Sequence, residues 1–347
     1  MAEQRDPGSP SPHPSPADGH GSGVPSSGFG LRVGQQANES LLTVLVALVT
    51  NLLIAAAKTA AAVITKSASM TAEAAHSWAD AGNEVFLVIA NERAARPPDQ
   101  EHPLGHGREA YVWSLFAALG LFLVGGAVSI YHGLAELGAP SRAENFLVGY
   151  VVLAISFVLE GLSFLRSAHQ ASVEAEAMHR DLIEHVLATS DPTLRAVFFE
   201  DAAALMGLVL AGAGLAAHQV TGSAVPDAIG SILIGLLLTA FAIQLINLNR
   251  QFLVGEEADP AVRNTVLQAL LELPEVARVT YLRLEVVGPR MISVVGDVDL
   301  AGDETESHVA VRLRALEAML TASPAVAGTV LSLSGPDEPS LSAMPRR

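Results

Sequence analysis

The chain has 347 residues, of which half are hydrophobic and only 16% are charged, and its formal net charge is −16 at pH 7. Because a soluble domain usually carries about a quarter of its residues as charged types, this composition indicates a membrane protein, and the acidic balance argues against nucleic-acid binding, which needs basic patches. The absence of cysteine excludes disulfides and thiolate metal sites, so any metal must be bound by His, Asp and Glu.

Residues 1–38 are rich in Pro, Ser and Gly, which predicts a disordered tail. A transmembrane domain over residues 39–250 follows, because its apolar segments approach the roughly 20 residues needed to cross a bilayer. Six helices are expected; they cover residues 40–63, 70–94, 110–134, 146–168, 195–217 and 226–248. The second is the least hydrophobic and would be missed by a strict hydropathy window.

The loops of this domain differ in charge between its two sides. Most of the arginines lie in the two long loops on one side, with only Lys66 and Arg142 on the other. The positive-inside rule then places the long loops and both termini in the cytoplasm. The stretch Glu174–Val186 has helical spacing and mixed charge, and it predicts a solvated surface helix.

Residues 251–337 have the composition of a soluble domain, and a frayed tail is expected over 338–347. Asp259 and Pro260 match the N-cap and first position of a helix, and two alternating segments joined by Gly288 and Pro289 predict paired strands. The expected order α-β-β-α-β indicates a small ferredoxin-like α/β domain with both helices on one face of a three-stranded sheet.

The second membrane segment contains AEAAHSWADAGNEV, residues 72–85, which is unusually polar for a bilayer. On a helix its polar residues fall in one stripe about 100° wide. These residues are Glu73, His76, Asp80, Asn83 and Glu84. A charged group at bilayer depth costs about 2.5–3.5 kcal/mol on insertion scales and persists mainly where it faces a cavity or a partner. The stripe therefore predicts a hydrophilic pathway.

His76 and Asp80 are four residues apart, so they point the same way and can bind one cation together. A tetrahedral ion needs further ligands, and the fifth segment offers the adjacent acids Glu200 and Asp201. These two lie about 100° apart on a helix and cannot both face one ion. We expect Asp201 to be the ligand, with Glu200 as the close alternative.

Lys58 and Glu160 are two more charges within apolar segments. Neutralisation of a carboxylate by Lys58 and proton transfer by Glu160 are weighed equally against packing roles. In the loop after the second segment, Asp99, His102 and His106 have a spacing that suits a shallow cation site. A His-rich loop alone is weak evidence, because such residues are common on solvated surfaces.

These motifs resemble those of the cation diffusion facilitator family, the zinc and manganese efflux transporters. The resemblance covers roughly Leu41–Asp337 and is carried by AEAAHSWAD, HPLGHGREAYVW and DPTLRAVFFEDAAALMG. The Glu–Asp pair in helix five is similar to the zinc transporter-9-like branch. The family implies six membrane helices, a tetrahedral site built from H/D-x-x-x-D motifs in helices two and five, and a homodimer linked by the C-terminal domain.

Carried onto this sequence, the resemblance assigns the helix-two half of the site to His76 and Asp80. Helix five departs from the pattern, since Val197 stands four residues before Asp201, so the pair Glu200–Asp201 is implied instead.

Asp99, His102 and His106 match the loop site of the bacterial zinc transporters in spacing. A charge interlock of relatives maps to Arg108 with Glu256 or Glu257. Only His308 is present in the region where many members bind a metal pair, which indicates a dimerisation domain without a strong metal site.

The sequence thus predicts a proton-coupled antiporter that exports a divalent cation by alternating access, with no prosthetic group. A His with carboxylates favours Zn²⁺, while the oxygen ligands of Glu200–Asp201 keep Mn²⁺, Fe²⁺ and Co²⁺ as alternatives. A membrane-anchored metal sensor or scaffold is a rival, but it needs no polar stripe, and a metal-dependent hydrolase lacks its H-E-x-x-H motif. We expect a lipid-embedded, multi-pass protein of a bacterial plasma membrane.

Overall fold

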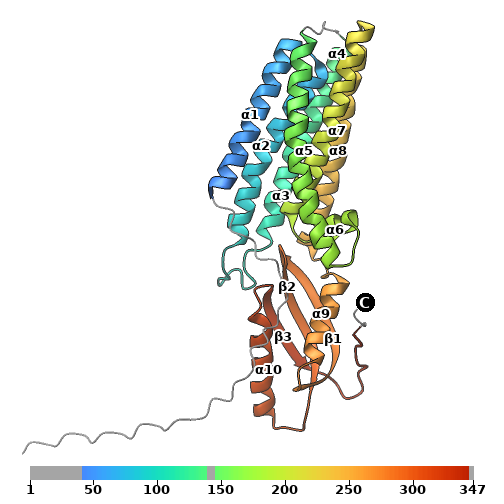
Figure 1. Ribbon diagram of the computed structural model, residues 1–347. Coiled ribbons are helices and arrows are strands. Elements are labelled where there is room, and N and C mark those ends of the chain that lie inside the picture. Colours follow the sequence, from blue (N-terminus) through green and yellow to red (C-terminus); the bar gives the residue numbers. More distant parts are fainter. Residues whose placement is uncertain (1–40, 139–144, 344–347) are drawn as a thin grey trace, which may run out of the picture.

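The structure is a computed structural model that describes residues 41–138 and 145–343. Its helices form a long bundle with a small α/β domain at one end (Figure 1). The predicted disordered tail over residues 1–38 and the last four residues of the predicted C-terminal tail lie outside the described residues.

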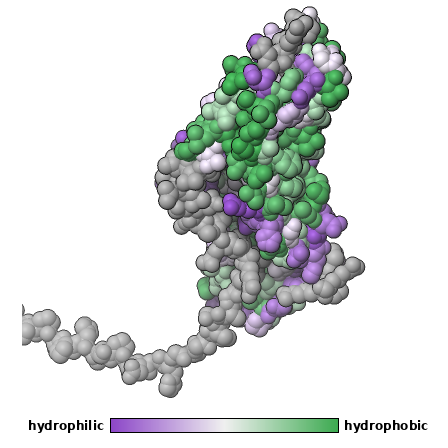
Figure 2. All heavy atoms as spheres, turned by 45° about the horizontal axis from the view of Figure 1, so that its top comes forward, coloured by the Kyte–Doolittle hydropathy of each residue, from purple (hydrophilic) through white to green (hydrophobic). Residues whose placement is uncertain are grey.

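Six helical spans form the bundle in the described part of the chain, as predicted. They are α1 (Leu41–Thr65), α2 (Ala68–Ala94), a third span of α3 (Glu109–Gly120), the π-helical η1 (Leu121–Ala127) and α4 (Val128–Gly138), then α5 (Phe146–Ala177), α7 (Pro192–Thr221) and α8 (Val225–Val254). Five of the six spans are long and apolar enough to cross a membrane, and α2 is the exception. Hydrophobic residues predominate on the face of the bundle that Figure 2 shows.

The predicted surface helix over Glu174–Val186 is wrong. Helix α5 continues to Ala177, the chain then turns at His179 with φ of 54°, and the short helix α6 (Leu182–Ala188) follows. Val186 is fully buried in a small apolar cluster with residues of α5 and α7. The mixed charge of the segment concealed this apolar contact, which holds α6 against the bundle.

The C-terminal domain has the predicted element order. Its elements are α9 (Pro260–Leu271), β1 (Val276–Gly288), β2 (Met291–Leu300), α10 (Glu306–Thr321) and β3 (Val326–Leu333). Strand β2 lies in the middle, antiparallel to β1 and parallel to β3. Asp259 caps α9 by accepting the backbone N–H of Ala261 at 2.8 Å. Leu267 of α9 and Leu316 of α10 are buried in the same core, which places both helices on one face of the sheet.

The chain after β3 is docked where the sequence predicted fraying, within the described residues. The backbone N–H of Leu341 donates to the carbonyl of Val279 on β1 at 2.8 Å. Leu341 and Ala343 also pack against the core of the domain. Their apolar side chains give this short segment a reason to stay on the sheet.

The domain packs directly on the end of the bundle. The rings of Tyr111 on α3 and Phe252 on α8 stack at 5.1 Å and belong to the core of the C-terminal domain. Gly107 and Gly288 bring two backbones together, since a Cβ on Gly288 would lie 2.7 Å from the Cα of Gly107. The loop before α3 therefore touches the turn between β1 and β2.

Candidate functional site

Helix α2 is fixed at its start by an acid from α8. Asp227 accepts hydrogen bonds from the hydroxyl of Ser67 at 2.9 Å and from the backbone N–H of Ala68 at 2.7 Å. This buried carboxylate satisfies donors that a helix N-terminus leaves unpaired. Sequence reasoning missed Asp227, although an acid within an apolar segment is a signal of such a role.

The polar stripe of α2 faces the interior of the bundle, as its helical spacing predicted. Glu73 and His76 are fully buried, and Asn83 is 2% exposed. The Nδ1 of His76 lies 3.3 Å from an Oδ of Asp80. These two side chains therefore share one location and can act on the same cation.

The two acids of α7 point to different neighbours. Glu200 accepts hydrogen bonds from the side-chain amide of Asn83 on α2. Asp201 instead accepts from Ser163 at 3.0 Å and from Ser167 at 3.3 Å, both on α5. The expectation that Asp201 is the main ligand, with Glu200 as the close alternative, stays a prediction. In the structure, the 100° step between neighbours turns Asp201 toward α5 and Glu200 toward α2.

Lys58 bridges two carboxylates between three helices. Its Nζ on α1 lies 2.9 Å from Glu73 on α2 and 2.7 Å from Glu160 on α5. The side chains of Lys58 and Glu73 are fully buried. The other oxygen of Glu73 lies over Gly207 of α7, where a Cβ would come within 2.4 Å of it. Lys58 thus neutralises a carboxylate, and Gly207 leaves the space that Glu73 occupies.

Several buried polar atoms along this stripe have no hydrogen-bond partner within the described residues. They are Oε1 of Glu73, both ring nitrogens of His76, Oδ1 of Asp80, Oδ1 of Asn83, Oε2 of Glu84 and Oε2 of Glu160. The second oxygen of Glu84 accepts from Asn51 on α1 at 2.7 Å. Buried polar groups are normally paired, so this concentration of unpaired ones is typical of a route that admits water or cations.

The predicted loop cluster is assembled. Asp99 lies 3.2 Å from Nδ1 of His102 and 3.0 Å from Nε2 of His106. The hydrogen bond with His106 comes first among the contacts that lower the pKa of Asp99 to about 2, and a backbone hydrogen bond from His102 adds to it. Among the described residues, this is the only group in which three metal-ligand atoms lie within 4.8 Å of one another. The acids and His76 inside the bundle are spaced more widely.

The expected interlock of Arg108 with Glu256 or Glu257 is wrong. Arg108 pairs with Glu285 on β1, and Glu257 lies 3.8 Å from Arg263. Residues 256–258 run beside β1, where the backbone N–H of Val286 donates to the carbonyl of Glu256 at 3.0 Å. This extra pairing places Glu285 beside Glu257, one of the two partners that the family resemblance had implied for Arg108.

Comparison with known proteins matches the region of the chain that forms the helical bundle. A family model described as the cation efflux transmembrane domain matches residues 44–254. The chain is 35% identical over 231 residues to metal tolerance protein C4 of Arabidopsis thaliana, a match of 67% of this chain and 50% of that protein. It is 33% identical over 240 residues to the mitochondrial proton-coupled zinc antiporter SLC30A9 of Xenopus laevis. This match covers 69% of this chain and 43% of that protein.

A bacterial relative is similar at lower identity. The manganese efflux system protein MneP of Bacillus subtilis is 23% identical over 240 residues, which cover 69% of this chain and 77% of MneP. The chain spans about half the length of the plant and animal relatives. The matched region holds α2, α7 and the loop cluster, so the residues assembled above lie within it.

Proposed function

The chain belongs to the cation efflux family of membrane transporters, and from this premise we propose that it carries a divalent cation through the bundle along the polar stripe of α2. One observation carries the proposal. His76 is fully buried, neither of its ring nitrogens has a hydrogen-bond partner among the described residues, and Asp80 lies 3.3 Å away. A buried polar group left unpaired costs about 1–3 kcal/mol, and a cation bound by His76 and Asp80 would offset that cost.

Glu200 is the third ligand in this proposal. Its hydrogen bond with Asn83 holds it against the α2 stripe. Asp201 takes a supporting role, held by the two serines of α5. Because these atoms are not gathered as closely as in the loop cluster, binding would draw α2 and α7 together.

Zn²⁺ is the proposed substrate. One imidazole with two carboxylates suits Zn²⁺, whereas an all-oxygen set suits Mn²⁺ better. Two relatives whose names state a zinc and a manganese activity keep Mn²⁺, and with it Fe²⁺ and Co²⁺, as alternatives to be tested.

Protons are the proposed counter-ions. His76 and Asp80 bind a metal only when deprotonated, so metal entry releases protons and proton return expels the metal. Glu73 of the stripe is paired with Lys58, which also pairs with Glu160, and we assign these three residues to the proton pathway together with Glu84. The loop cluster of Asp99, His102 and His106 is proposed as a second, shallow cation site.

The charge of the loops supports an orientation in the membrane. We propose a homodimer in a bacterial plasma membrane, with both termini and the C-terminal domain in the cytoplasm and metal moved outward. Strand β3 is an edge of its sheet and exposes Val330 and Leu333, which supports pairing through this domain. Cross-linking in native membranes tests the dimer.

Zinc flux tests the transport proposal. Purified protein in liposomes containing a zinc dye should move Zn²⁺ into the vesicles when a pH gradient drives protons out of them. His76→Ala and Asp80→Ala should abolish this movement. Mn²⁺, Fe²⁺ and Co²⁺ compared in the same vesicles rank the substrates. If Asp80→Ala moved Zn²⁺ as fast as wild type, the proposed ligand set would be wrong.

A further inference from the structure

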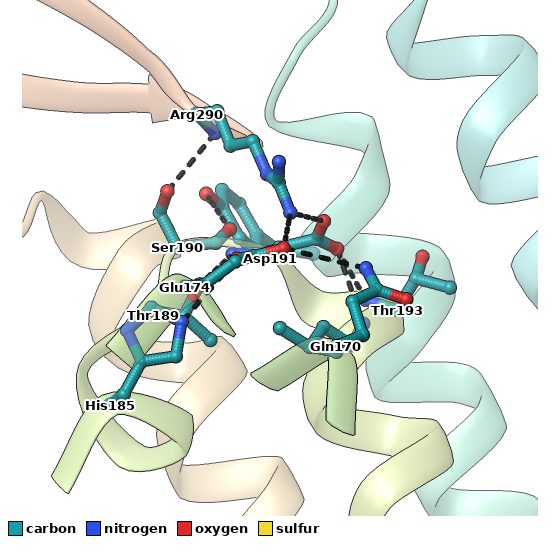
Figure 3. Close-up of polar contacts among 10 residues, drawn as sticks. Gln170, Glu174, His185, Thr189, Ser190, Asp191, Thr193 and Arg290 are labelled. Atoms are coloured by element: carbon teal, nitrogen blue, oxygen red, sulfur yellow. Dashed lines mark hydrogen bonds and ion pairs between the residues drawn. The ribbon is translucent and has the colours of Figure 1, made fainter. Parts of the chain in front are cut away.

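The turn between β1 and β2 reaches into the bundle and holds the start of α7. The guanidinium of Arg290 in this turn lies 2.8 Å from Glu174 on α5 and 3.3 Å from Asp191 (Figure 3). Its backbone N–H donates to the hydroxyl of Ser190 at 3.0 Å. Arg290 therefore joins the C-terminal domain to two transmembrane helices.

Asp191 is the N-cap of α7. One of its oxygens accepts the backbone N–H groups of Thr193 at 3.0 Å and Leu194 at 3.3 Å, while the other faces Arg290. Asp191 is 5% exposed. Glu200 lies nine residues further along the same helix, about 14 Å at 1.5 Å per residue. A displacement of Asp191 would therefore move helix α7, which carries Glu200.

Arg290 occupies an unfavourable backbone conformation. Its φ is 58°, in the left-handed region that suits glycine and is uncommon for other residues. Two residues connect Gly288 to Met291, and turns with a positive φ at the second of these positions, such as type II, usually place glycine there. The backbone of this turn would favour glycine at position 290. The ion pairs of the arginine side chain give a reason why arginine stands there instead.

A cavity and a second ion pair lie beside Arg290, between the domain and the helices. A cavity of about 840 Å³ lies between α5, α6 and α9, lined by residues that include His185, Arg263 and Arg290. Across it, Arg180 pairs with Asp259. Next to this cavity, the polar contacts of Arg290 link the domain directly to the N-terminus of α7.

We propose that Arg290 is a positioning residue for transport, which couples the C-terminal domain to the N-terminus of α7 through Asp191. The inference rests on the proposed transport role of Glu200. When the domain shifts, Arg290 carries the movement to α7 and so to the spacing between Glu200 and the α2 stripe. On the other side of the same turn, Gly288 lies against Gly107 in the loop that carries the His-rich cluster.

Zinc transport by variants of the full-length chain in liposomes tests the proposal. Arg290→Gln removes the charge, and Asp191→Asn removes its partner while keeping an equally good N-cap. Each should lower the maximal rate by roughly three- to tenfold, or about 0.7–1.4 kcal/mol in barrier, with KM changed less than twofold. The double variant should be no slower than the slower single variant, since both break one link. Arg290→Lys should recover part of the rate.

Arg290→Gly separates positioning from stability. Glycine relieves the strained turn, so Arg290→Gly should melt at a higher temperature in detergent than Arg290→Gln, although both lack the ion pairs and both should transport slowly. Arg283→Gln changes an exposed arginine on β1 and serves as the matched control with wild-type transport. His76→Ala in parallel vesicles reports on the transport site independently.

The outcomes are separable. Wild-type rates for Arg290→Gln and Asp191→Asn, with His76→Ala inactive, would overturn the role of Arg290 and leave the transport site intact. Wild-type transport by Arg290→Gly would also overturn it. If His76→Ala were itself fully active, the proposed function would fail first.

Discussion

The side-chain amide of Asn83 on α2 donates to the carboxylate of Glu200 on α7, so the polar stripe of one helix meets an acid of the other inside the bundle. The next residue, Asp201, is held by two hydroxyls of α5. Two adjacent acids thus have separate surroundings. Glu200 faces the stripe of α2, and Asp201 faces α5.

This geometry ranks the two acids. Glu200→Gln should weaken Zn²⁺ binding by at least about tenfold, equal to about 1.4 kcal/mol, because the amide loses the charge that a metal ligand needs. Asp201→Asn should have a smaller effect, since Ser163 and Ser167 can still donate to its remaining carbonyl oxygen. Zinc titration of both purified variants checks the order, and an equal or larger loss in Asp201→Asn would contradict it.

Local sequence patterns predicted the helices and strands well. They predicted poorly which residues from distant parts of the chain lie in contact. The period of the α2 stripe placed Glu73, His76 and Asn83 on one buried face, because helical spacing is a property of adjacent residues. The same spacing could separate Glu200 from Asp201 by angle but could not say which neighbouring helix each one faces.

Contacts that depend on how distant segments pack lay beyond such reasoning. The pair Arg108–Glu285 follows from the short backbone pairing of residues 256–258 with β1. Asp227 capping α2, and Arg290 reaching Asp191, each join residues about a hundred or more positions apart. Nothing in the local sequence fixes such distances; they arise from packing of the whole bundle.

Lys58 is expected to stabilise the bundle. Replacing it with Met leaves Glu73 and Glu160 buried without their shared cation, and breaking a buried ion pair in this way costs about 3–5 kcal/mol. The melting temperature of Lys58→Met in detergent should fall accordingly. Adding Glu73→Gln should restore part of the loss because it removes one uncompensated charge; a double variant as unstable as Lys58→Met would show that charge is not the cause.

The loop cluster predicts a defined response to pH. Its contacts lower the pKa of Asp99 from an ordinary 3.8 to about 2. The fold therefore favours the carboxylate, whose contribution to loop stability is present above the ordinary pKa and is lost as the pH falls through about 2. Asp99 is thus ionised at every pH used for transport, including the range from pH 7.5 to 5.5.

Zinc titrations on a His76→Ala, Asp80→Ala background isolate this cluster from the bundle. Asp99→Asn should weaken the remaining zinc binding by a similar factor at pH 7.5 and 5.5. His102→Ala should weaken it as well, because it removes one of the three ligand atoms of the cluster. Unchanged affinity in Asp99→Asn would contradict a role for this loop in cation binding.

A substitution at Gly207 tests the polar stripe of α2 without replacing any charged residue. A Cβ at this position would lie 2.4 Å from Oε1 of Glu73, whereas a Cβ on Gly212 of the same helix would meet nothing within 4 Å. Both changes to Ala bring the same gain in helix propensity, up to about 1 kcal/mol. Gly207→Ala should displace Glu73 from Lys58 and slow zinc flux, while Gly212→Ala should transport as wild type with equal or higher stability. Equal flux in the two variants would mean that the position of Glu73 does not matter for transport.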